Sequence, residues 1–373
     1  MTSKISNNIK NPNNINLILE DGSIFKGKTF GSTLESIGEV VFNTSMTGYQ
    51  EMLTDPSYSG QIVISTYPLI GNYGINKIDF ESKKIQVAGF VIKNLCTEPS
   101  HNSSEFTLNE FLKSQSIPGI YDVDTRALAK KIRQKGVMSG KISKENSTDI
   151  FFSELKNSTP YSQTNFVYTT STEKNYTWTS KTDKTQQKLK IVVMDFGLKY
   201  NILRILESKG CEVIVVPANS TKEKILGLSP DGIVLSPGPG DPSLLSDIVD
   251  VVKQLPPKLP IFGICLGNQI LAHAFGAKTF KLKFGHRGSN HPVKDLKSDT
   301  VSITSQNHGY SIDPESLPTE LEITHFNLND ETIEGIRHKT LPIMSIQFHS
   351  EASPGPKDNE YIFDDFLNLI EKK

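Results

Sequence analysis

The chain of 373 residues is longer than a typical single domain, so its length favours two domains, each large enough to bury its own core. Its 40 Lys and Arg residues nearly balance 41 Asp and Glu residues. The net charge of -1 gives no electrostatic reason to expect a nucleic acid or an anionic membrane as partner, and it favours a small neutral or zwitterionic ligand.

The cysteines and the N-terminus indicate the compartment. Three cysteines that lie far apart, Cys96, Cys211 and Cys265, argue against a disulfide framework and for a reducing environment with Cys265 as a free thiol. No apolar run approaches the roughly 18 residues of a membrane span, and the N-terminus lacks the apolar core of a signal peptide. We therefore expect a soluble protein, cytoplasmic or, if an organelle encodes it, in the plastid stroma.

The first half of the chain predicts an α+β domain over residues 16–157, behind a disordered tail of residues 1–15 that is rich in Asn, Ser and Lys. The stretch NLILEDGSIFKG is typical of a hairpin around Asp21-Gly22. The stretch DTRALAKKIRQKG predicts a short helix that ends at Gly136. We expect no phosphate-binding loop in this half.

A linker is expected over residues 158–189, where Ser, Thr, Lys and Asn dominate and apolar periodicity is weak. Its few aromatic side chains, such as Phe166 and Trp178, can pin it to a domain surface. The linker therefore need not be flexible.

Residues 190–373 predict a second domain of the α/β class. The short apolar runs KIVVMDF, CEVIVVPA, DGIVL and LPIFGI alternate with segments of helical spacing. Strands that are apolar throughout are buried on both faces, so we expect an open, mostly parallel sheet with flanking helices. In such sheets ligands bind beyond the carboxyl ends of the strands.

Capping residues indicate where the helices of this domain are expected to begin and end. The first helix is expected to bury Leu198 and to close at Gly210, and the second to begin with Asp241 as its cap. The segment 285–351 predicts shorter strands and loops, and 361–371 predicts a final helix.

The stretch GICLG places a cysteine between two glycines where a strand turns directly into a helix. This is the thiol version of a nucleophile elbow, which lifts the side chain above the sheet edge and sets it at a helix N-terminus that favours a thiolate. An arbitrary cysteine is more often a small buried hydrophobe. The glycines on both sides of Cys265 favour the nucleophile, with the N–H of Leu266 directed at a developing oxyanion.

A nucleophilic thiol needs a base and a group that orients the base. His349 ends the strand-like run PIMSIQF, and Glu351 follows two residues later, so both are expected at the same sheet edge as the elbow. A histidine at a strand end can also be an ordinary surface residue. The pairing with Glu351 favours a catalytic role.

Two further stretches have some features of binding sites. The loop SPGPGDP also follows a strand, and Gly238 and Gly240 let backbone N–H groups approach a ligand, although the loop lacks the third glycine of a dinucleotide site. His286 and His291 could suggest a metal, but no Cys or acidic residue has matching spacing. We therefore expect no metal.

Several of these motifs together carry a family resemblance. GICLGNQ with FHSE resembles the class I glutamine amidotransferases, whose triad is Cys-His-Glu. DFGLKYNILR, KFGHRGSNHPVKD, SQNHGY and EASPGP resemble one branch of that family, the small chains of carbamoyl-phosphate synthase. VFNTSMTGYQEMLTDPSYSGQI and GIYDVDTRALAKKIRQKG resemble the N-terminal domain of the same small chains. The resemblance extends from Asn16 to Ile370.

The resemblance implies a role for each matching residue. Cys265 would be the nucleophile, His349 the general base and acid, and Glu351 the carboxylate that orients the histidine. The residues implied to bind glutamine are Ser45, Gly238, Gly240, Leu266, Gln269, Asn307, Gly309 and Tyr310. Ser45 would reach the substrate from the other domain.

The sequence departs from the family pattern at three positions. Ser350 stands where many relatives have proline, Asn268 where many have histidine, and Pro237 where asparagine is frequent. No reacting atom is lost. Ser350 loosens a turn that proline would stiffen, which affects the geometry of His349 and Glu351 more than any other part of the implied triad.

The implied reaction is the hydrolysis of L-glutamine to glutamate and ammonia through a cysteine thioester. The one match to G-x-x-x-x-G-K-[ST], Gly22 to Thr29, lies within the expected hairpin and does not lead from a strand into a helix, so we expect no cofactor in this chain. ATP and Mg would belong to a separate large chain, which makes carbamoyl phosphate from bicarbonate for arginine and pyrimidine biosynthesis. Ammonia would protonate in water, so we expect a tight complex, a heterodimer or a higher assembly, with an internal passage and with residues 16–157 as the docking domain.

Two other functions stay open at this point. The chain could be the glutaminase component of a different synthase, which the whole N-terminal domain and EASPGP argue against. It could instead be an interaction subunit without activity, which the intact Cys265, His349 and Glu351 argue against.

Overall fold

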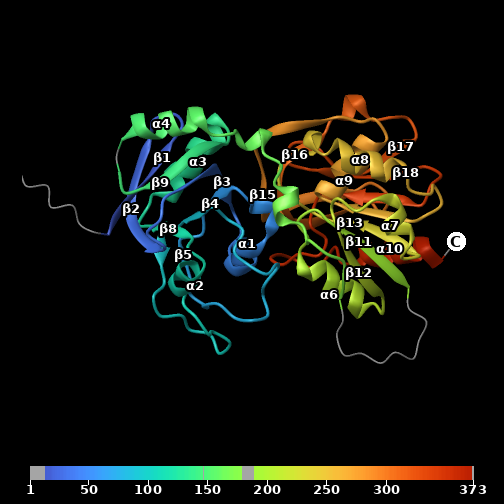
Figure 1. The fold of residues 1–373 in the computed structure, drawn as a ribbon, viewed down its shortest axis with the longest axis horizontal. Coiled ribbons are helices and arrows are strands. Elements are labelled where there is room, and N and C mark those ends of the chain that lie inside the picture. The colour runs from blue at the N-terminus through green and yellow to red at the C-terminus, as the bar shows by residue number, and fades with distance from the viewer. Residues whose placement is uncertain (1–12, 146, 179–188, 372–373) are drawn as a thin grey trace, which may run out of the picture.

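The computed structural model describes residues 13–145, 147–178 and 189–371, which form two lobes side by side (Figure 1). Most of the expected disordered tail lies outside these residues, and its last two positions, Asn14 and Ile15, already belong to strand β1. Among the described residues, every helix is too short or too polar to cross a membrane.

The N-terminal lobe is built on a closed barrel of seven strands in the order β1-β2-β8-β6-β4-β3-β9. The strands are β1 (Asn14–Leu19), β2 (Ile24–Gly31), β3 (Ser36–Asn43), β4 (Gln61–Ser65), β6 (Gly89–Val91), β8 (Pro118–Tyr121) and β9 (Met138–Ser143), with a small separate pair of β5 (Leu69–Ile70) and β7 (Asn94–Leu95). Its helices are α1 (Tyr49–Thr54), α2 (Leu108–Ser114), α3 (Thr125–Lys135) and α4 (Thr148–Asn157), with a 3-10 turn at Pro56–Tyr58.

The local predictions for this lobe are confirmed. β1 and β2 form the expected hairpin, in which Gly22 takes the left-handed φ of 82° that the turn requires. α3 is capped by the Asp124 side chain and ends at Gly136, whose φ is 100°. The barrel itself was not foreseen from the sequence, because its closure joins strands that are far apart in the chain.

The C-terminal lobe is an α/β domain around a ten-stranded sheet in the order β10-β12-β11-β13-β14-β19-β18-β17-β15-β16. The strands are β10 (Tyr176–Trp178), β11 (Lys190–Asp195), β12 (Glu212–Pro217), β13 (Gly232–Leu235), β14 (Ile261–Ile264), β15 (Thr279–Asp295), β16 (Thr300–Ile312), β17 (Leu321–Asn327), β18 (Ile333–His338) and β19 (Ile343–Ile346). The helices are α5 (Val167–Thr170), α6 (Tyr200–Ser208), α7 (Lys222–Leu226), α8 (Ser246–Lys253), α9 (Leu266–Ala274) and α10 (Tyr361–Glu371). Single 3-10 turns occupy Tyr161–Gln163, Pro242–Leu244 and Pro314–Ser316.

Two apolar cores cover the two faces of the central strands. Ile191 and Val193 of β11 pack with α6 and α10, whereas Val192 and Met194 of the same strand pack with α8 and α9. This alternation explains why these strands are apolar at every position. Burial on both faces removes the polar side that a half-exposed strand would have.

The expectation of a mostly parallel sheet is correct only for its centre. β12, β11, β13, β14 and β19 are parallel, but β18, β17, β15 and β16 add an antiparallel half, and β10 is antiparallel at the other edge. The region expected to hold shorter strands and loops, 285–351, contains most of β15 and all of β16, strands of 17 and 13 residues. Bulges and polar sequences hide these long strands from a search for apolar runs.

Two smaller expectations, for Leu198 and Asp241, need correction. Leu198 is buried but precedes α6, and Asp241 caps the 3-10 turn at Pro242–Leu244 instead of α8. The described part of the expected linker contains β10, which pairs with β12, and Trp178 packs on Tyr200. Residues 179–188 of that linker lie outside the described residues.

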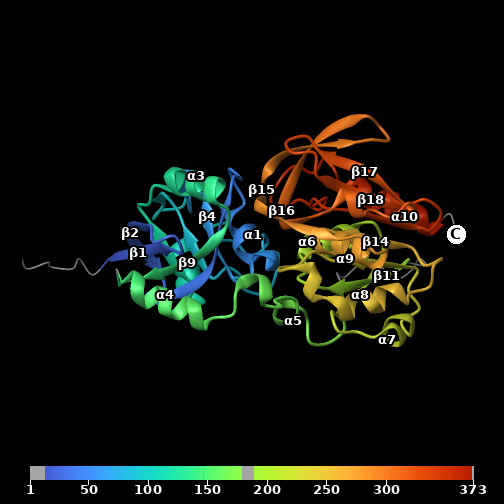
Figure 2. The same ribbon diagram turned by 90° about the horizontal axis from the view of Figure 1, so that it is seen from above.

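The two lobes meet where α1 and the inner ends of β15 and β16 face one another (Figures 1 and 2). The N–H of Thr44, in the barrel lobe, donates to the Arg287 carbonyl of β15 at 3.2 Å. The carboxyl ends of β13, β14 and β19 open toward the same junction, where the catalytic candidates lie.

Candidate active site

Cys265 lies between the end of β14 and the start of α9, with backbone angles φ 54° and ψ -104°. A residue other than glycine adopts this region rarely, and such strain is typical of a nucleophile elbow. Neither of the flanking glycines, Gly263 and Gly267, has a positive φ. A Cβ on Gly263 would lie 2.6 Å from the Gly267 carbonyl oxygen, and a Cβ on Gly267 would lie 2.2 Å from the Leu235 carbonyl oxygen. The glycines provide space, and Cys265 itself carries the strain.

His349 and Glu351 form a buried pair just after β19. The imidazole Nδ1 of His349 lies 2.6 Å from Glu351 Oε1, and the backbone N–H of His349 donates to the Ser305 carbonyl of β16. Nε2 has no hydrogen-bond partner among the described residues, so it is available to a reacting group. The thiol of Cys265 lies beside this ring. Its Sγ also donates to the Asn307 carbonyl oxygen, at 3.7 Å. The structure therefore brings the three expected triad residues together.

The charges around this pair favour an imidazolium. Burial alone would lower the pKa of His349, but the Glu351 carboxylate outweighs it and raises that pKa to about 10. Burial alone would raise the pKa of Glu351, but Lys199 and His349 hold it at about 2. A cation beside the sulfur favours the thiolate form that attacks a substrate.

These two shifts define the pH range over which the pair stabilises the fold. The raised pKa of His349 contributes stability that is complete below its ordinary value of 6.5 and is lost as pH rises through about 10. The lowered pKa of Glu351 contributes stability that is complete above 4.5 and is lost as pH falls through about 2. The ion pair should therefore persist throughout the neutral range.

Replacing Glu351 with Gln should lower the pKa of His349 below 6.5, because burial and Lys199 both disfavour the imidazolium once the carboxylate is gone. An NMR titration of the ring in labelled protein measures this directly. Glu315→Gln, which changes an exposed carboxylate on another turn, should leave the titration unchanged. A His349 ring that still titrates near pH 10 without Glu351 would show that this carboxylate does not hold the charge.

Lys199 is a member of the site that the sequence did not reveal. Its Nζ lies 3.1 Å from Glu351 Oε1, and it also donates to the Ala352 carbonyl. Burial alone would lower its pKa, but Glu351 and Glu81 raise it, so the ammonium is retained in the interior. The available signal was a lysine directly after an apolar strand and before an apolar helix, in DFGLKYNILR.

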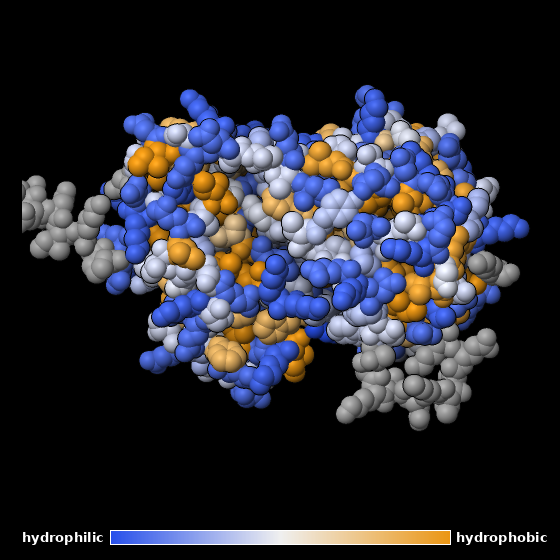
Figure 3. All heavy atoms as spheres, in the orientation of Figure 1, coloured by the Kyte–Doolittle hydropathy of each residue, from blue (hydrophilic) through white to orange (hydrophobic). Residues whose placement is uncertain are grey.

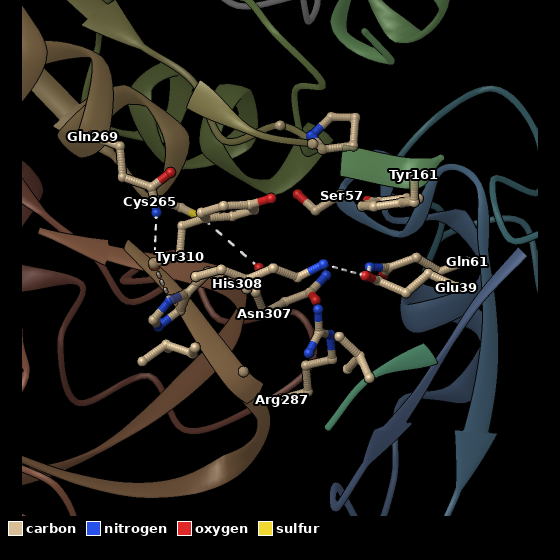
Figure 4. Close-up of a pocket in the computed structure, with 18 residues that line it drawn as sticks. Glu39, Ser57, Gln61, Tyr161, Cys265, Gln269, Arg287, Asn307, His308 and Tyr310 are labelled. Carbon is tan, nitrogen blue, oxygen red and sulfur yellow. Dashed lines mark hydrogen bonds and ion pairs between the residues drawn. The ribbon is translucent and has the colours of Figure 1, made fainter. Parts of the chain in front are cut away.

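A cavity at the junction of the lobes contains Cys265 on its wall (Figure 4). Most of the residues expected to bind glutamine line this cavity: Gly238, Gly240, Gln269, Asn307, Gly309 and Tyr310. The Gln269 amide donates to the Tyr310 carbonyl at 2.9 Å, which ties α9 to β16 across the cavity. Leu266 does not line it with its side chain, which packs in the core, so any role of Leu266 rests on its backbone.

The opposite wall of the cavity comes from parts of the chain for which the sequence predicted no substrate contact. Glu39 and Gln61 of the barrel face the cavity, and Glu39 forms an ion pair with Lys281 at 2.7 Å (Figure 4). Tyr161, from the segment expected to be a linker, lines the same wall. Arg287 is buried here and donates to the Phe284 carbonyl. The cavity thus needs both lobes to exist.

Ser45 lies in a second, smaller cavity, together with His349 and Lys199. Its hydroxyl is 2.9 Å from the Ser289 hydroxyl of the other lobe. Asn307 lines both cavities and donates to Asp55 at 2.8 Å. Ser45 therefore lies on the His349 side of the triad and does not line the Cys265 cavity.

The three departures from the family pattern leave the triad geometry intact. Ser350, between His349 and Glu351 in the chain, is fully buried, and His349 Nδ1 still lies 2.6 Å from Glu351 Oε1. Asn268 is buried and donates to Gln347 while it accepts from Ser345, so its role is structural. The carbonyl of Pro237 accepts the Ser236 hydroxyl at 2.8 Å.

The histidines considered as metal ligands have acidic neighbours that their spacing in the chain did not suggest. His286 Nε2 lies 2.8 Å from Asp330, and its Nδ1 lies 3.5 Å from Glu334, because antiparallel pairing brings β15, β17 and β18 together. The three buried side chains that lie close enough together to hold a metal ion are His286, His308 and Glu334, and His291 is not among them. Asn327 and Gln306 donate to the two oxygens of Glu334, so hydrogen bonds within the chain satisfy this carboxylate.

Two models of known protein families match parts of this chain. The model of the carbamoyl-phosphate synthase small chain, CPSase domain, matches residues 17–142, and that of the class I glutamine amidotransferases matches residues 192–369. The carbamoyl phosphate synthase small chain of Fusobacterium nucleatum is 51% identical over 360 residues, which cover 96% of this chain and 98% of that one. The same protein of Akkermansia muciniphila is 52% identical over 360 residues, which cover 95% and 96%.

A solved structure from Thermoplasma acidophilum, described as a GMP synthase component, is similar to half of the chain. It covers 50% of this chain and 96% of its own length with 26% identity and a TM-score of 0.45.

Proposed function

The chain belongs to the family of carbamoyl phosphate synthase small chains, and from this premise we propose which residues hydrolyse glutamine and where the ammonia leaves. Its function is that of the glutamine-hydrolysing subunit, which supplies nitrogen for carbamoyl phosphate in arginine and pyrimidine biosynthesis. The observation that carries the proposal is a strained Cys265 on a cavity wall beside the buried pair of His349 and Glu351.

In the proposed reaction the thiolate of Cys265 attacks the side-chain carbonyl carbon of glutamine. The C–N bond breaks as His349 gives its proton to the leaving nitrogen, so ammonia departs and a γ-glutamyl thioester remains. His349 then takes a proton from water, the hydroxide oxygen attacks the thioester, and the C–S bond breaks to release glutamate. Glu351 and Lys199 remain charged and hold the imidazole in place.

The remaining expected residues are proposed to bind and polarise the substrate. The backbone N–H of Leu266, at the start of α9, and that of Gly238 would stabilise the oxyanion. Gly240, Gln269 and Tyr310 would hold the amino-acid end within the cavity that they line. This division leaves the reacting carbonyl close to Cys265.

We propose that ammonia leaves through the second cavity, on the side of His349 where Ser45 and Pro354 lie. The receiver would be a large chain that binds ATP and Mg, since the one match to the phosphate-loop pattern in this chain, Gly22 to Thr29, forms a hairpin turn and strand β2 and does not lead into a helix. The barrel lobe is the proposed docking surface. It exposes large apolar side chains such as Met46 and Ile78, and Figure 3 shows hydrophobic patches on that lobe.

A comparison of nitrogen sources tests this function. The chain assembled with the large chain should make carbamoyl phosphate from glutamine and release glutamate, and the large chain alone should do so only from ammonium. Equal use of glutamine with and without this chain would contradict the proposal. A chain that assembles but never supports glutamine use would favour the alternative of a silent interaction subunit.

Replacing Ser45 with Ala should raise the KM for glutamine several-fold, because the loss of one hydrogen bond to a ligand costs roughly 0.5–1.5 kcal/mol. Steady-state kinetics of the complex with glutamine as the varied substrate measure this KM. The structure supplies a matched control, since Ser289→Ala removes the partner of Ser45 without removing its hydroxyl. If both variants raise KM equally, the contact between the lobes is what matters, and Ser45 does not touch the substrate.

A further inference from the structure

Glu81 caps a helix that belongs to the other lobe. The α6 helix begins at Tyr200, and its own N-cap residue, Lys199, provides no side-chain cap. The N–H of Tyr200 donates instead to the Glu81 carbonyl at 2.9 Å, and the N–H of Asn201 donates to Glu81 Oε2 at 3.0 Å. The first turn of α6 thus obtains its hydrogen-bond acceptors from the barrel lobe.

The capped turn holds the catalytic carboxylate. The Asn201 side-chain amide donates to the Glu351 carbonyl at 2.6 Å, and Lys199 Nζ contacts Glu351 Oε1 at 3.1 Å. Lys199 also bonds the next carbonyl, that of Ala352. The position of Glu351, and through it the orientation of His349, therefore depends on where α6 begins.

Glu81, which belongs to the barrel lobe, is held both by α1 of its own lobe and by Arg204 of α6. Its N–H donates to the Thr54 hydroxyl at the end of α1, and its second oxygen pairs with Arg204 at 2.8 Å. Arg204 also donates to the carbonyls of Ile78 and Phe80 in the same barrel segment. Glu81 itself is fully buried.

A second contact between α1 and the catalytic segment supports the same connection. Gly48, at the start of α1, packs so closely on Pro354 that a Cβ there would lie 2.0 Å from the Pro354 Cβ. The segment that contains Glu351 is thus held by α1 directly and, through Glu81, by α6.

We propose that Glu81 is a positioning residue that couples the barrel lobe to the His349–Glu351 pair. This inference rests on the proposed function of that pair. Burial raises the pKa of Glu81 to about 7, although Lys199 and Arg204 oppose it. The Asn201 N–H is a neutral donor, so an uncharged side-chain oxygen at position 81 can accept from it as the carboxylate does.

Two substitutions in the assembled complex test the proposal. Glu81→Ala should lower kcat for glutamine by about tenfold to hundredfold, the cost of a catalytic group displaced by a remote change. The KM for glutamine should stay within about twofold, because the substrate-binding residues are elsewhere. Glu81→Gln keeps an oxygen acceptor for the Asn201 N–H and should restore most of kcat. Synthesis from ammonium should be unchanged in both variants.

The pH dependence of Cys265 alkylation by iodoacetamide separates positioning from simple loss of stability. A displaced Glu351 holds the imidazolium less well, so in Glu81→Ala the alkylation profile should move to higher pH. Glu105→Ala, which breaks an exposed ion pair with Lys77 near the same segment, should change neither kcat nor the profile.

If Glu81→Ala does not fold, Asn201→Ala removes only the amide that reaches Glu351 and should shift the profile in the same direction. If the pH profile of Cys265 alkylation is unchanged in whichever of these two variants folds, the inference is overturned, whether or not kcat is lower. A wild-type complex that cannot use glutamine would instead overturn the proposed function.

Discussion

With Cys265 replaced by Ser, the complex with the large chain should lose carbamoyl phosphate synthesis from glutamine almost completely. Serine changes little in volume, so it can occupy the strained position at the start of α9. A hydroxyl is far harder to ionise than a thiol, and the imidazolium of His349 that favours a thiolate cannot supply an alkoxide. Loss of an activated nucleophile lowers kcat by factors of up to about a million in comparable enzymes.

The same variant should still make carbamoyl phosphate when ammonium replaces glutamine, because bicarbonate and ATP would be handled on the other chain. Measurement of both nitrogen sources on one preparation is therefore decisive. Retained activity with glutamine would make the nucleophile assignment wrong. Failure of ammonium to rescue an assembled complex would make the proposed division of labour wrong.

The sequence predicted those parts of the site that are local in the chain. The elbow requires only a strand, a helix and glycines next to Cys265, and the pair of His349 and Glu351 lies two residues apart. The apolar strands from β11 to β14 were recognisable for the same reason, since burial on both faces leaves a continuous apolar run.

The rest depends on contacts between distant segments. Lys199 reaches Glu351 across 152 positions of the chain, and the Glu39–Lys281 pair joins the barrel to the antiparallel half of the sheet. Periodicity within a short window carries no information about such pairs. Even at the elbow, the sequence did not show that Cys265 itself has a positive φ, or that Gly267 is needed for its close approach to Leu235.

Replacing His349 with Asn should lower kcat for glutamine by about a hundredfold to ten-thousandfold, the range that positioned proton transfer contributes. Folding should survive, because Glu351 keeps Lys199 as a partner at 3.1 Å and is not left as an unpaired buried charge. The KM for glutamine should change little, since the cavity residues proposed to bind it are untouched. The residual rate should rise with pH, because without the imidazolium only alkaline solution supplies a thiolate, whereas Cys265→Ser should show no such rise. Kinetics over a range of pH with both variants would check this, and a His349→Asn complex with wild-type kcat would remove the histidine from the mechanism.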